Sequence, residues 1–159
     1  MAKYDDNVQR LLNIMQSTFG DQFKTYYDDD PEQIPDFNLP CIVVTKNGDT
    51  TTEGAYGVDD VEEELVVKVI LNKKDDFSAD VDPTNMTQRK IRDFIGKRDP
   101  ETGLYDEKSV KGALRALALE GILAIAPTMT VVYGITPRLN DTLTAEGHVT
   151  FKITYSVDT

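Results

Sequence analysis

The 159-residue sequence has no tryptophan, one cysteine and one histidine. A single cysteine cannot form an intrachain disulfide, and the apolar run CIVV around Cys41 indicates a buried small hydrophobe rather than a reactive thiol. The histidine, His148, falls on the polar side of an alternating segment, and no serine lies in a G-x-S-x-G motif. The sequence therefore lacks the usual parts of a nucleophilic triad, and without tryptophan it lacks the side chain best suited to stack on a sugar.

Long apolar runs are also absent. No segment approaches the roughly 20 residues that a membrane-spanning helix needs, and the start MAKYDDNVQR lacks the apolar part of a signal peptide. We therefore expect a protein made in the cytoplasm, with no membrane partner.

Cations are scarce, since 17 lysines and arginines face 28 aspartates and glutamates, for a net charge of −11. So few cations cannot neutralise a row of phosphates, which argues against a nucleic-acid reader. A protein that stays close to DNA without binding it remains compatible with this charge.

Phosphate and metal motifs do not match. Gly96-Lys97-Arg98 lacks the rest of a Walker motif, and calcium-loop frames that start at Asp28 or Asp80 miss the required glycine and glutamate. We therefore predict no cofactor, no metal and no enzymatic activity.

The hydrophobic pattern predicts one domain over residues 1–159, of α+β class. A helix is expected over residues 4–19, and a helix pair over residues 85–96 and from Asp106 onward, where Asn85 and Gln88 form a capping pair at the start of the first. Strands are expected over residues 23–27, 41–46, 63–72, 128–135 and 148–157. Residues 47–54 and 136–147 are interpreted as loops. Runs of strands interrupted by a block of helices favour a mainly antiparallel central sheet, flanked by the N-terminal helix and the mid-chain pair.

An acidic run directly precedes the most apolar strand of the chain. Its members are Asp59, Asp60, Glu62, Glu63 and Glu64. A metal site needs oxygen ligands that converge, whereas consecutive side chains at the start of a strand point to alternating faces. We therefore interpret the run as electrostatic surface that repels DNA.

Two further features are candidate contacts with other chains. Along residues 65–72 one side of the expected strand is wholly apolar and the other is half apolar, through Val66 and Ile70 with Lys68 between them. Arg138 lies in the expected loop between the last two strands, and arginine is enriched at interfaces. Val66, Lys68, Ile70 and Arg138 are thus predicted to form an oligomer or partner interface, although helices of the same chain could also cover the two apolar residues.

The order of elements resembles that of the tail terminator, or tail completion, proteins of long-tailed bacteriophages. The resemblance covers nearly the whole chain and rests on several phrases that follow the leading amphipathic helix: FKTYY, LPCIVVTK, ELVVKVILNKKDDF, RKIRDFIG, VKGALRAL, TVVYGI and HVTFKITYSV. It implies a structural virion protein, made in the host cytoplasm. Copies of it would form a ring, typically a hexamer, that caps the head-proximal end of the tail tube and ends tube polymerisation.

The resemblance also implies the partners: other copies of the chain, the major tail tube protein, a head–tail connector or neck protein, and DNA only in transit. It implies no cofactor and supplies no fixed residue motif. A head-completion or neck connector protein has a similar composition and stays open as an alternative. From a different class, a carboxylate-based, metal-dependent hydrolase also stays open, since the chain has many acids.

Overall fold

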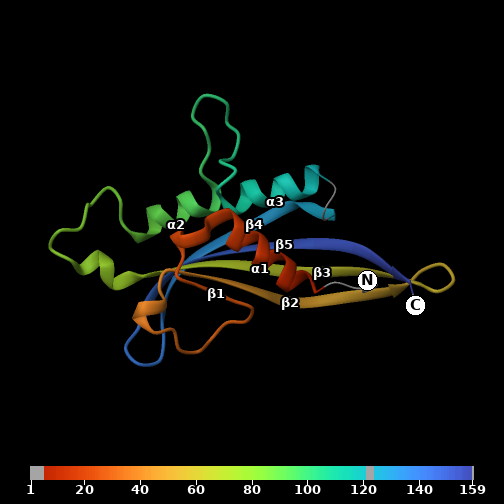
Figure 1. Cartoon of the computed structure of the whole chain (residues 1–159), viewed down its shortest axis with the longest axis horizontal. Coiled ribbons are helices and arrows are strands. Elements are labelled where there is room, and N and C mark those ends of the chain that lie inside the picture. Colours follow the sequence, from red (N-terminus) through yellow and green to blue (C-terminus); the bar gives the residue numbers. More distant parts are fainter. Residues whose placement is uncertain (1–5, 121–123, 159) are drawn as a thin grey trace.

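The structure, a computed structural model, describes residues 6–120 and 124–158. Within these residues it is an α+β fold with a five-stranded, mainly antiparallel sheet, as predicted (Figure 1). The main elements are α1 (Asn7–Phe19), β1 (Thr25–Tyr27), β2 (Cys41–Glu53), β3 (Val58–Asn72), α2 (Thr87–Gly96), α3 (Val110–Leu119), β4 (Ala124–Pro137) and β5 (Leu143–Asp158). None of the helices in the described residues combines the length and the apolar character needed to span a membrane.

The strands follow the order β1-β2-β3-β5-β4 across the sheet. The short strand β1 runs parallel to β2, and all the other neighbours are antiparallel. β2, β3 and β5 are long, so that their ends extend past the helices (Figure 1). We call this extension the arm: residues 48–64 of the β2–β3 hairpin together with residues 152–158 of β5.

All three helices pack on one face of the sheet, the helix face. β3 contributes its alternate apolar residues to this core, and the helices contribute Leu11 and Met15 from α1, Ile91 and Ile95 from α2, and Leu114 from α3. A Cβ atom on Gly147 of β5 would lie 2.4 Å from Ile95 Cδ1 and 2.6 Å from Ile91 Cγ2, so glycine at this position lets α2 approach the sheet closely.

The opposite face, the open face, is covered only in part, by the proline-rich segment of residues 28–40. Ile34 and Leu39 from that segment pack against Cys41 and Ile70. Cys41 is fully buried, and burial raises the pKa of its thiol to about 12. The cysteine is therefore a core residue, as predicted.

Two expected loops turned out to be largely strand. Residues 47–53 continue β2, and the chain turns only at residues 54–57, where Gly57 has φ of 71°. The second expected loop, residues 136–147, shrinks to residues 138–142, because β4 runs to Pro137 and β5 begins at Leu143. In both cases pairing with a neighbouring strand overrode a local sequence typical of turns.

The start of α2 was also predicted incorrectly. The helix begins at Thr87, and Asn85 does not cap it. Instead Asp76 accepts hydrogen bonds from the Thr87 backbone N–H at 3.0 Å and from Thr87 Oγ1 at 2.7 Å. Burial raises the pKa of Asp76, but the bonds from Lys73 and Thr87 outweigh it and the pKa is lowered.

Candidate assembly surfaces

Arg138, predicted to be an interface residue in a long loop, lies inside the protein. Its side chain is only 7% exposed. Its guanidinium donates to Asp30 Oδ1 at 2.8 Å, to the Pro31 carbonyl at 2.7 Å and to Glu146 Oε2 at 2.7 Å. Arg138 therefore holds the segment of residues 28–40 against the sheet. The prediction that it anchors an interface is wrong.

The same cluster contains most of the buried charge on the open face. His148 Nε2 lies 2.8 Å from Glu146 Oε1, and Lys68 Nζ lies 2.6 Å from Asp30 Oδ2. Burial raises the pKa of Glu146, but hydrogen bonds from His148, Thr144 and Arg138 outweigh it and lower the pKa to about 2. Burial likewise opposes the ionised form of Asp30, whose pKa is nevertheless lowered by Arg138 and Lys68. Every charge in this cluster has a partner, which is typical of structural pairs.

Two other predicted interface residues are also buried. Val66 is 4% exposed, and Ile70 is fully enclosed by the segment that covers the open face. Neither side chain can contact another chain in this conformation. Lys68 is half-buried and paired with Asp30, so it too serves the internal cluster.

The acidic run divides between the two faces of the sheet. The pairing register places Asp60, Glu62 and Glu64 on the open face and Asp59 and Glu63 on the helix face.

Glu63 is 1% exposed and accepts hydrogen bonds from Asn7 Nδ2 at 3.1 Å and from the Tyr155 hydroxyl. Its assignment to a DNA-repelling surface is therefore wrong, because it belongs to the packing between α1 and the sheet. The arm's exposed acids make cross-strand contacts, such as Glu62 with Lys152 at 3.4 Å.

The carboxylates do not converge as a metal site would require. Across residues 6–120 and 124–158, no group of three or more histidine, cysteine, aspartate or glutamate side chains is placed to hold an ion.

The sheet has open edges on both sides. β4 is an end strand, and its outer edge has no strand partner within the described residues. On the opposite side, β1 covers β2 only from Cys41 to Val43, so the outer edge of β2 is open beyond that point. An unpaired edge presents backbone N–H and C=O groups to any strand that can align with it.

β4 is unusual for an open edge because it contains no charged residue. None of its residues is buried, and its apolar side chains include Val132 at 63% exposure and Ile135 at 57%. Within it, residues 128–133 read TMTVVY, a strand-forming run without charge, proline or glycine. Proteins normally protect such an edge, and this uncharged run is the signal that sequence reasoning missed.

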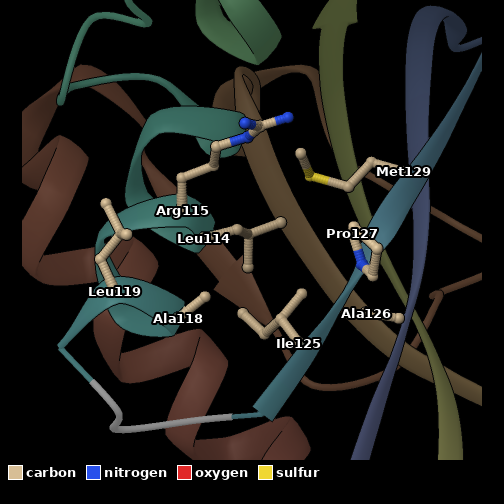
Figure 2. Close-up of a pocket in the computed structure, with 8 residues that line it drawn as sticks. All are labelled: Leu114, Arg115, Ala118, Leu119, Ile125, Ala126, Pro127 and Met129. Carbon is tan, nitrogen blue, oxygen red and sulfur yellow. The ribbon is translucent and has the colours of Figure 1, made fainter.

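An apolar hollow of about 260 Å³ lies between α3 and the first half of β4 (Figure 2). Leu114 and Ile125 line it, with Met129 and the exposed Arg115 nearby at its rim. The volume is below the 300–1,000 Å³ typical of small-molecule sites, so the hollow fits one or two side chains better than a ligand.

No protein family matches the chain, and a search of curated proteins found no match to it. The geometry of the sheet edges and of the arm is therefore the main guide to function.

Proposed function

We propose that the protein is a ring-forming structural subunit of a phage virion. In this proposal the ring, typically of six copies, caps the head-proximal end of the tail tube, ends tube polymerisation and joins the tail to the neck. The partners are other copies of the chain, the tail tube protein and the head–tail connector. DNA passes through the ring without binding.

The observation that carries the proposal is the pair of open edges on opposite sides of one sheet. A closed ring of identical subunits needs a heterologous interface, in which one surface of each copy meets a different surface of the next. A sheet with a free edge at each side offers two such surfaces, β4 and the outer part of β2.

The distribution of charge supports passage of DNA. Helices occupy one face of the sheet, so a ring built from its edges would present the two faces to opposite sides, one of them toward the channel. The open face of the arm has Asp60, Glu62 and Glu64, opposed by Lys152. Placed toward the channel, these carboxylates would repel phosphates and keep DNA moving.

The experiment combines native mass spectrometry of the purified protein with negative-stain microscopy after it is added to tail tubes that were assembled without it. We expect ring-shaped oligomers that bind one end of each tube and stop further growth. A monomer that never binds tubes would exclude the proposal. Rings that bind isolated head connectors and ignore tubes would instead favour the head-completion alternative.

A further inference from the structure

The open edge of β4 is the surface that most requires a partner. Its 14 residues contain no charge, and the run TMTVVY has the composition of strands that pair with other chains. Pro127 and Pro137 lie at or near its ends, which leaves residues 128–136 without a proline to block pairing.

The open edge of β2 is suited to be that partner. Along the sheet, β2 and β4 run in opposite directions, because each step from β2 through β3 and β5 to β4 is antiparallel. If one sheet continues into the next in a ring, β4 therefore meets β2 of the neighbour in antiparallel orientation. Antiparallel pairing is the more stable form.

The open part of β2 and part of β4 also lie in the same register rows across the sheet. Thr45 pairs with Val66, Val66 with Thr150, and Thr150 with Thr130, so these residues form one row across the sheet. By the same register, the open part of β2 from Val44 onward is level with β4 up to Val131, a stretch that includes Pro127 and the irregular pairing between Ile125 and Met129. The second half of β4 is level with the part of β2 that β1 already covers.

Charge complementarity favours this pairing over β4 against β4. On the helix face, the exposed Arg115 lies at the rim of the hollow beside β4. On the same face of β2 lie the exposed Glu53 and Asp49, whose carboxylate Oδ2 lies 2.9 Å from Nζ of Lys46 in the same strand. Pairing of β2 with β4 brings these opposite charges to one seam, whereas a two-fold β4–β4 contact would bring Arg115 toward its own copy.

We propose that the outer edge of β4 in one copy pairs, antiparallel, with residues 44–53 at the outer edge of β2 in a second copy. This inference rests on the proposed ring and names the edges that close it. The arm's open face then continues from copy to copy around the ring.

Disulfide trapping tests the pairing directly. Neighbouring residues on antiparallel strands have Cα atoms about 4.5–5.5 Å apart, within disulfide range. Because the native Cys41 is fully buried, introduced thiols react alone. Thr130→Cys is combined in turn with Thr45→Cys, Thr50→Cys and Thr52→Cys, which all lie on the open face and sample different registers.

The matched control combines Thr130→Cys with Thr154→Cys. Thr154 is exposed on the same face but belongs to β5, which is paired on both sides. Under mild oxidation, we expect at least one β2–β4 pair to give a ladder of linked multimers that collapses on reduction. The control should stay at the background level of linkage.

Two results would overturn the inference. One is the absence of a ladder in all three pairs. The other is efficient dimer formation by Thr130→Cys alone, which would indicate a two-fold β4–β4 contact. Native mass spectrometry and tube binding of the unmodified protein separate the two proposals. Rings without linkage would refute these edges but not the ring. Linked rings that ignore tubes would refute the tail-tube role but not the edges, and a protein that stays a monomer and never binds tubes would refute both.

Discussion

The two ends of β3 show how differently one strand is used. From Leu65 to Leu71 the strand is almost wholly buried, with helices on one face and the segment 28–40 on the other. From Val58 to Glu64 it belongs to the arm, where Glu63 alone is buried and the open face is bare. The C-terminal half, Leu65–Leu71, makes its contacts within the chain. The N-terminal half, Val58–Glu64, together with the open edge of β2 beside it, has contacts to gain from another chain.

The largest effect on stability is expected from Arg138→Met, at the end of the sheet that the segment 28–40 covers, which we call the covered end. The substitution leaves Glu146 and Asp30 without their shared cation, and loss of one partner of a buried ion pair costs about 3–5 kcal/mol. Urea denaturation should show this loss as a lower free energy of unfolding. Lys152→Met, which removes the exposed partner of Glu62 on the arm, should change stability by less than about 1 kcal/mol. Equal effects of the two substitutions would remove the contrast between the ends.

The covered end should also be sensitive to acid through Glu146. Its pKa is lowered from 4.5 to about 2 in the fold, so the folded state binds fewer protons than the unfolded state in this range. The stabilisation is present above about pH 4.5 and is lost as the pH falls toward 2; it amounts to about 3 kcal/mol. Glu146→Gln should flatten this part of the stability-versus-pH curve. A curve with unchanged slope would show that other carboxylates govern acid unfolding.

The next comparison is between the effects on stability of adding a methyl group at Gly147, under the helices, and at Gly48, in the arm. A methyl group at Gly147 would overlap Ile91 and Ile95, so Gly147→Ala should destabilise the protein by about 1–3 kcal/mol. A methyl group at Gly48, on the open edge of β2, would meet nothing within 4 Å. Thermal denaturation should therefore show a clear loss for the first substitution and little change for the second. The reverse order would mean that the helix face is loosely packed.

The smallest effect on stability is expected from neutralising the open-face acids of the arm. Asp60→Asn, Glu62→Gln and Glu64→Gln together should change stability by no more than about 0.5 kcal/mol per site. Their effect should show in DNA retention at low salt, which we expect to rise because the repulsive potential falls.

A matched triple substitution of exposed acids outside both the arm and the segment 28–40 removes the same charge: Asp80→Asn, Glu101→Gln and Glu107→Gln. An equal rise in DNA retention for both sets would show that only net charge matters, against a specific role for the arm.

Local patterns in the sequence were sufficient for the fold class and most elements. The alternation in β5 and the apolar stripe of α1 encode their structure directly. The continuation of β2 was missed because NGDTTTE has the composition of a turn, while its strand form depends on pairing with the acidic half of β3. The role of Arg138 was missed because one of its partners, Asp30, lies 108 residues away in the chain. Only the fold brings these charges together.

Hydrogen exchange followed by mass spectrometry is the most direct test of the claim that β4 and the outer part of β2 pair between copies. In the dilute, unassembled protein, peptides that cover residues 128–136 and 44–53 should have fast-exchanging amides at their outer edges. On assembly, both peptides should gain protection together, while peptides from β5 change little because that strand is already paired on both sides. Assembled protein in which β4 exchanges as fast as in the dilute state would contradict the account.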